Sequence, residues 1–177
     1  MAPAAGSGGT ERRRRRQRHE RLGFRLALGL LHVHQAVYEL TDGRLGHRLL
    51  GVPCLLLRAT GRRTGRTRTT ALLYAMDGDD YLVVASLGGA PRAPEWLHNV
   101  RARPEVGVQV GRERFPAVAT VVDRGDDEYD RLWRVVNDSS GGRYDRYQRQ
   151  TTRPIPIVRL TVREMSTGRA ASSSTGP

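Results

Sequence analysis

A loop rich in arginine and glycine is the first segment whose composition suggests chemistry. Residues 61–68 read GRRTGRTR and join two apolar segments that we expect to be strands. Arginine binds anions through paired N–H groups, and glycines at both ends permit backbone conformations that let N–H groups converge on an anion. This is not a nucleotide-binding P-loop, because that motif ends in Gly-Lys-Ser or Gly-Lys-Thr and this chain has no lysine. An anion-binding turn and an ordinary solvated hairpin tip both remain compatible with the composition.

Two further candidates follow in the chain. Residues 85–91 read ASLGGAP, and adjacent glycines at the end of a strand let a flat ligand or a phosphate approach the backbone closely. Trp96, in the next segment, either stacks on a ring or fills the core, and core filling is the more common use of tryptophan. His98 on the same segment is more typical of packing or capping than of catalysis. Because the histidines are scattered and Cys54 is the single cysteine, we predict no metal site.

The elements that must position these residues are mostly strands. Apolar runs separated by turn residues predict strands at 53–60, 68–76, 81–86, 106–110, 115–122 and 155–162. Helical signals cover a short segment from 94 or 95 to before 104, and a second one at 126–136. A loop at 139–142 precedes a short segment rich in tyrosine. We therefore predict an α+β domain whose six or so strands, mostly antiparallel, close into a barrel, since closure removes exposed edges.

The N-terminal region carries half of the net charge of +12. Residues 11–25 hold eight arginines and two glutamates. The sequence predicts a basic disordered arm at 1–19, a single domain at 20–163 that opens with an amphipathic helix at 20–40, and a disordered tail at 164–177. The apolar stretch in the helix is too short and too interrupted for an export signal. We expect the helix to pack on its own domain or, as the second interpretation, residues 11–40 to lie on an anionic membrane.

Composition narrows the class of protein. The chain has 177 residues, 38% hydrophobic and 6% aromatic, which suits one globular domain. No apolar run approaches the length of a membrane-spanning helix, and one cysteine fits a reducing cytoplasm. Scarce aromatic residues and the lack of a recognised motif make nucleic-acid binding through the arm the weaker alternative.

Five ordered segments together resemble a known family. They are GRRTG at 61–65, RTT with LLY at 68–74, SLGGAP at 86–91, WLHN with RARPEV at 96–106, and YQ with RPIPI at 147–157. This pattern is similar to the deazaflavin-dependent nitroreductases, split β-barrel enzymes of actinobacteria that use coenzyme F420. The resemblance covers roughly residues 40–162 and departs from the family at Leu87, where lysine is common.

The resemblance implies a function and a set of site residues. The protein is expected to transfer a hydride from reduced F420 to an electron-poor acceptor such as a quinone, a nitroaromatic compound or a conjugated enone. Implied cofactor-binding residues are Arg62, Arg63, Thr64, Gly65, Arg68, Ser86, Gly88, Gly89, Trp96 and Asn99. Implied catalytic residues are Tyr147, Ser86 and Tyr144. A split-barrel protein that binds flavin mononucleotide (FMN) or haem is the alternative.

The resemblance and the charge also imply partners and a location. Split barrels commonly pair, so a homodimer is expected. The enzyme is expected in the cytoplasm, with residues 11–40 holding it peripherally on the inner face of the plasma membrane, where quinones reside. Removing residues 1–20 distinguishes the classes, because a reductase should keep its turnover with soluble acceptors and a nucleic-acid binder should lose its activity.

Overall fold

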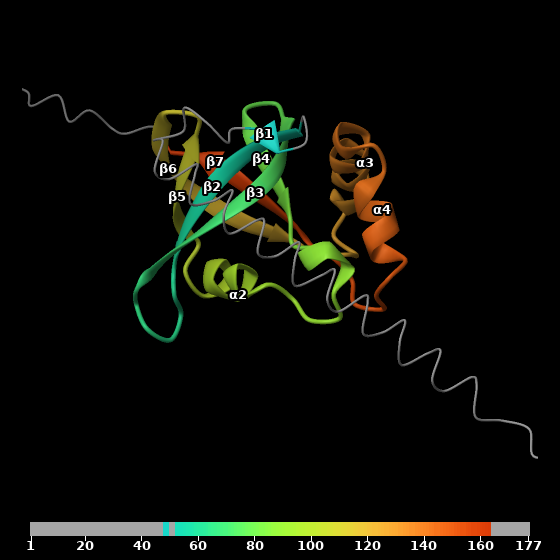
Figure 1. The fold of residues 1–177 in the computed structure, drawn as a ribbon, viewed down its shortest axis with the longest axis horizontal. Helices are drawn as coiled ribbons and strands as arrows, with labels where there is room; N and C mark the ends of the chain where they lie inside the picture. The colour runs from blue at the N-terminus through green and yellow to red at the C-terminus, as the bar shows by residue number, and fades with distance from the viewer. Residues whose placement is uncertain (1–47, 50–51, 164–177) are drawn as a thin grey trace, which may run out of the picture.

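Six antiparallel strands form a closed barrel (Figure 1). The computed structural model describes residues 48–49 and 52–163. Neighbouring strands pair in the order β2-β3-β4-β7-β6-β5, and pairing of β2 with β5 closes the ring. The strands are β1 (Arg48–Leu49), which pairs only with the start of β2, β2 (Val52–Thr60), β3 (Thr67–Asp77), β4 (Asp80–Val84), β5 (Glu105–Val110), β6 (Glu113–Val122) and β7 (Ile157–Val162). The predicted barrel of about six strands is confirmed.

Alternate side chains of the strands fill the interior of the barrel. In β2, Leu55, Leu57 and Ala59 belong to the interior core, whereas Cys54 and Leu56 form a separate cluster with β3 on the other face. This period of two is what a pleated strand imposes on successive side chains. The interior is therefore a packed apolar core.

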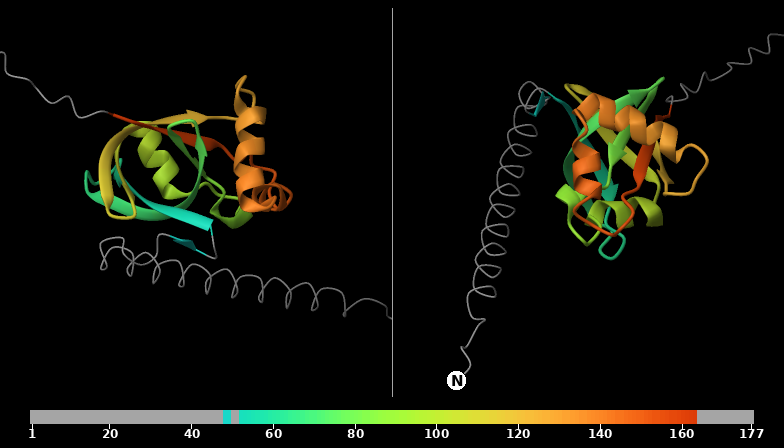
Figure 2. Two further views of the ribbon diagram at one scale, coloured as in Figure 1. Left: turned by 90° about the horizontal axis from the view of Figure 1, so that it is seen from above. Right: turned by 90° about the vertical axis from the view of Figure 1, so that its right-hand side faces the viewer.

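One helix closes an end of the barrel and two others cover its side. Seen from above, α2 (Glu95–Ala102) lies across the ring of strands (Figure 2), and Trp96, Leu97 and Val100 join the interior core. The helices α3 (Tyr129–Ser140) and α4 (Arg143–Gln148) stand together beside the barrel and pack on a second core with residues of β3, β4, β6 and β7. Left-handed Gly141 and Gly142 make the sharp turn between them.

An ion-pair cluster attaches α3 to the barrel. Arg131 donates two hydrogen bonds to the Asp77 carboxylate at 2.6 and 2.8 Å, and this guanidinium holds the pKa of Asp77 below its usual range. Arg159 of β7 lies 3.4 Å from Asp80 and also pairs with Glu128, just before α3. The cluster fixes the side helices relative to the strands.

Several predicted boundaries are wrong by a few residues. The strand expected at 81–86 ends at Val84, and a short 3-10 turn, η1 (Leu87–Gly89), follows it. The helix expected at 126–136 runs from Tyr129 to Ser140, because the Asp126 carboxylate accepts a hydrogen bond from the Asp123 N–H at 2.8 Å and forms a turn instead. The expected loop at 139–142 is thus reduced to its two glycines, and the last strand begins at 157. The predicted arm, the helix at 20–40 and the tail at 164–177 lie outside the described residues.

Candidate functional site

The arginine-rich loop is a compact turn between β2 and β3. The Gly61 N–H donates to the Arg66 carbonyl at 2.9 Å, and the Gly65 N–H donates to the Gly61 carbonyl at 2.8 Å. Gly65 has a φ of +66°, a conformation that favours glycine. The side chains of Arg63, Arg66 and Arg68 are exposed. The loop therefore presents several guanidinium groups to solvent on a closed backbone turn.

Contacts with α2 fix this loop at the end of the barrel. The backbone N–H of Arg62 donates to Asn99 Oδ1 at 3.1 Å, and Asn99 is only 7% exposed. The Arg62 guanidinium donates to the Glu95 carboxylate at 2.9 Å and lowers the pKa of that carboxyl. Asn99 thereby joins the loop to the helix.

Glu95 competes with any anion for Arg62, which yields a first prediction. Glu95→Gln removes a negative charge and frees the guanidinium, so we expect an anionic cofactor to bind about two- to fivefold more tightly, the effect of an exposed ion pair. Titration with F420 measures this change. Glu113→Gln, an exposed carboxylate of the β5–β6 hairpin at the other end of the barrel, should leave the affinity unchanged. Equal or weaker binding by Glu95→Gln would contradict this reading of Arg62.

The glycine loop occupies the same end of the barrel (Figure 1). Leu87, Gly88 and Gly89 have φ values of +46°, +63° and +79°, so three successive residues are left-handed. Leu87 is the only residue other than glycine with a positive φ in the described part of the chain. A Cβ on Gly89 would meet the carbonyl oxygen of Tyr147 at 2.8 Å. The loop thus packs directly on α4, with Ser86 buried at its start.

The two predicted tyrosines differ in exposure. Tyr144 is 6% exposed and belongs to the core between α4 and the barrel, where burial raises the pKa of its phenol to about 12. Tyr147 is partly buried at the edge of that core, and its ring centre lies 6.2 Å from that of Tyr144. Tyr147 is therefore the better placed of the two to contact a bound molecule, and Tyr144 supports it from the core side.

Trp96 fills the core. Its side chain is 7% exposed within the interior cluster of the barrel. Of the two uses that the sequence allows, core packing is the one that the structure gives, and contact with a cofactor ring stays a prediction.

Sequence reasoning gave no role to three residues that the structure places in this region. Glu95 neutralises Arg62. The sequence offered one signal for Glu95, because acidic residues are favoured in the first turn of a helix. Gln150 lies against Gly89. Arg153 contacts the carbonyl of Ser86, which lies 67 residues earlier in the chain. No local pattern reveals the last two contacts, because they depend on how α4 folds back on the barrel.

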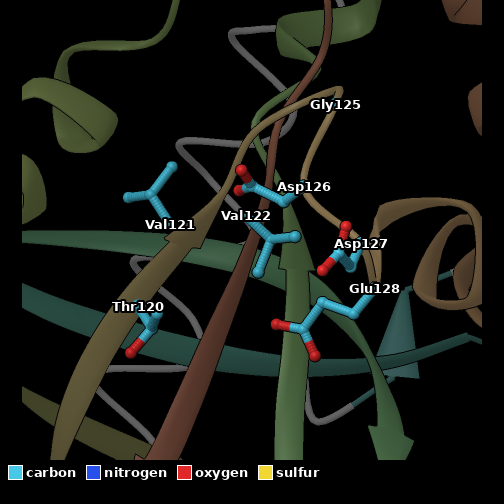
Figure 3. A pocket seen from close by; sticks show the side chains of 7 residues that line it. All are labelled: Thr120, Val121, Val122, Gly125, Asp126, Asp127 and Glu128. Atoms are coloured by element: carbon cyan, nitrogen blue, oxygen red, sulfur yellow. The ribbon is translucent and has the colours of Figure 1, made fainter.

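Other features of the described region do not extend the site. A shallow hollow near the end of β6 is lined by residues 120–122 and 125–128 (Figure 3), none of them a predicted cofactor residue, and its three carboxylates disfavour an anion. Within residues 52–163, no group of three His, Cys, Asp or Glu side chains is placed to hold a metal ion. Burial raises the pKa of the Cys54 thiol to about 12, which removes its nucleophilic form. Among the described helices, none has the length and apolarity to cross a membrane.

The fold and this end of the barrel define a class of protein. The closed antiparallel barrel with a helix across one end is a split-barrel fold. The sequence pattern of the family described as F420H(2)-dependent quinone reductase matches residues 30–162. The chain belongs to this family.

Individual relatives agree with the family match. An F420H(2)-dependent quinone reductase of Mycobacterium tuberculosis is 52% identical over 135 residues, covering 76% of this chain and 91% of the relative. A solved F420-H2 dependent reductase (FDR-A) has a TM-score of 0.54 at 32% identity, covering 61% of this chain and 93% of its own. Another solved structure, described as a domain-swapped dimer, has a TM-score of 0.57 at 29% identity and covers 72% of this chain and 96% of its own.

Proposed function

We propose that this protein binds reduced F420 and reduces a quinone. The observation that carries the proposal is the cationic β2–β3 loop at the same end of the barrel as the glycine loop, in a chain of the F420H(2)-dependent quinone reductase family. The donor set fits the cofactor, because its tail is a phosphodiester ending in glutamates and guanidinium groups bind both phosphate and carboxylate. When bound, the reduced deazaflavin supplies a hydride and strongly favours two-electron transfer.

Each part of the site has a proposed task. Arg62, Arg63 and Arg68, with Thr64 and Gly65, hold the anionic tail. Ser86, Gly88 and Gly89 lie against the deazaflavin ring. Trp96 and Asn99 support these segments from the barrel end. The protein thus contributes binding and orientation, while the reactive chemistry belongs to the cofactor.

Ser86 and Tyr147 are proposed to stabilise charge on the acceptor. Their hydroxyl groups donate hydrogen bonds to the quinone oxygen that becomes negative, which lowers the barrier electrostatically. We expect Tyr147→Phe and Ser86→Ala each to lower kcat/KM for a soluble quinone by about tenfold, the loss of roughly one hydrogen bond. The affinity for F420 should change less. Unchanged kcat/KM in both variants would remove these residues from the mechanism.

A titration tests the cofactor itself. Purified protein is titrated with F420 while tryptophan fluorescence is followed, and FMN serves as the competitor. Because the chain has two tryptophans, Trp133→Phe separates the signal of Trp96 from that of α3. Saturable quenching by F420 that FMN fails to reverse supports the proposal. Preference for FMN, or binding of neither, would refute it.

A membrane surface and a second copy of the chain are the proposed partners. We place the enzyme in the cytoplasm, with residues 11–40 on an anionic membrane through their arginines and apolar residues. Full-length protein should sediment with anionic liposomes, less so in high salt, whereas a variant lacking residues 1–20 should stay in solution with its turnover of soluble quinones intact. Equal sedimentation of both would contradict the membrane role.

The domain-swapped dimer of a related structure supports a homodimer, which light scattering measures.

A further inference from the structure

Arg153 reaches three backbone carbonyls of the glycine loop. Its Nη2 lies 3.3 Å from the carbonyl oxygen of Ala85, 3.2 Å from that of Ser86 and 3.4 Å from that of Ala90. These three residues flank η1 on both sides. One guanidinium group therefore links the two ends of the loop by hydrogen bonds.

The loop needs such support because of its backbone conformation. Left-handed geometry at Leu87 costs about 1–2 kcal/mol for a residue that carries a Cβ. Inside the loop, the Gly89 N–H donates to the Ser86 carbonyl at 3.0 Å and the Ala90 N–H to the Leu87 carbonyl at 3.2 Å. Two backbone hydrogen bonds in so short a turn give it little stability of its own. External contacts must hold its shape.

Gln148 holds the segment that carries Arg153. Its Nε2 donates to the carbonyls of Thr151 and Arg153 at 3.1 and 3.0 Å, and its Oε1 accepts from the Ile155 N–H at 3.0 Å. Gln148 is the last residue of α4, the helix that carries Tyr144 and Tyr147. Hydrogen bonds thus run from α4 through residues 151–155 to the glycine loop.

We propose that Arg153 is a positioning residue that shapes the glycine loop for the cofactor and, through Gln148, fixes that loop relative to Tyr147. The inference rests on the proposed function only for the identity of the molecule that the loop contacts. Loss of Arg153 should loosen the loop and weaken cofactor binding, because an ordered loop binds without a further entropy cost.

Amide hydrogen exchange of the full-length, cofactor-free protein tests whether Arg153 holds the glycine loop in shape. In Arg153→Ala, we expect exchange of the Gly89 and Ala90 amides to accelerate at least about tenfold, as for the loss of a charge-assisted hydrogen bond. Exchange in β2 and β3 should stay unchanged. Arg149→Ala, which removes an exposed arginine just after α4, is the matched control. Unaltered exchange at Gly89 and Ala90 would overturn the proposal.

F420 affinity and chemical rescue test whether the loop shape that Arg153 maintains serves cofactor binding. We expect Arg153→Ala to bind F420 about tenfold more weakly, and added guanidinium, but not equal sodium chloride, to restore part of the affinity and the slow exchange. Faster exchange with unchanged F420 affinity would overturn the positioning role. If wild-type protein fails to bind F420, the proposed function fails, while the exchange comparison still decides whether Arg153 holds the loop.

Discussion

Replacing Gly89 by alanine is expected to weaken F420 binding severely. A Cβ at this position would lie 2.8 Å from both the Tyr147 carbonyl oxygen and Gln150 Oε1. The Gln150 side chain can move, but the carbonyl belongs to the last turn of α4 and cannot shift without the helix. Gly89 also has a φ of +79°, which adds strain for any other residue. The loop must therefore move away from α4, and we expect F420 affinity to fall at least about 100-fold, since loss of a preorganised site costs several kcal/mol.

A second glycine separates the steric effect from the backbone effect. Gly78, in the turn between β3 and β4, has a φ of +62°, and a Cβ there meets nothing within 4 Å. Gly78→Ala should lower the free energy of unfolding by about 1 kcal/mol, the cost of left-handed backbone, and leave F420 binding unchanged. Fluorescence titration and chemical denaturation of both variants make the comparison. Near-normal F420 affinity in folded Gly89→Ala would show that the cofactor does not use this loop.

Removing three of the four arginine charges of residues 61–68 is expected to have a similarly large effect. In the triple variant Arg62→Gln, Arg63→Gln, Arg68→Gln, the backbone hydrogen bond from residue 62 to Asn99 is retained, so the turn should persist. Charge-assisted hydrogen bonds contribute about 1.5–3 kcal/mol each, so loss of two of them lowers F420 affinity by roughly 100-fold or more. The salt dependence of binding should diminish as well, because fewer charges remain to be screened.

The tail of the cofactor provides the discriminating measurement. Wild-type protein should bind F420 much more tightly than the deazaflavin chromophore without its tail, and the triple variant should bind both equally. Replacing Arg112, Arg134 and Arg163 by glutamine removes three exposed arginines elsewhere and serves as the control for net charge. If the triple variant still prefers F420, the tail binds at another surface.

Prediction from sequence succeeded where the signal is local. The strands of β2, β3, β5 and β6 lie where alternating apolar residues and turn residues place them, because both patterns act over a few neighbouring positions. The predicted boundaries of α3 and β4 were wrong by a few residues. The Asp126 side chain accepts a hydrogen bond from the Asp123 N–H in a turn that precedes α3, and the glycine loop that follows β4 packs on α4, a contact that its own residues do not encode.

The arginine and glycine loops could be found from their composition, but their arrangement could not. Residue types alone showed that 61–68 suits an anion and that 86–89 suits a close approach to the backbone. That both lie at one end of the barrel follows from the antiparallel pairing of β2 with β3 and of β3 with β4, which places the β2–β3 loop and the end of β4 at the same end. Tyr144 was implied by the family resemblance, whereas only the packing of α4 shows that it is buried and that Tyr147 lies at the edge of the core.

The sequence by itself determined the barrel class, the cationic loop, the glycine loop and the family to which they point, because alternation, turn chemistry and motif order are written in neighbouring residues. Only the tertiary structure decided that Glu95 neutralises Arg62, that Gly89 presses on α4 and that Arg153 holds the glycine loop. These contacts join residues 33 to 68 positions apart. Hydrogen bonds over such separations form only after the barrel has brought their partners together, so no short pattern in the chain can specify them.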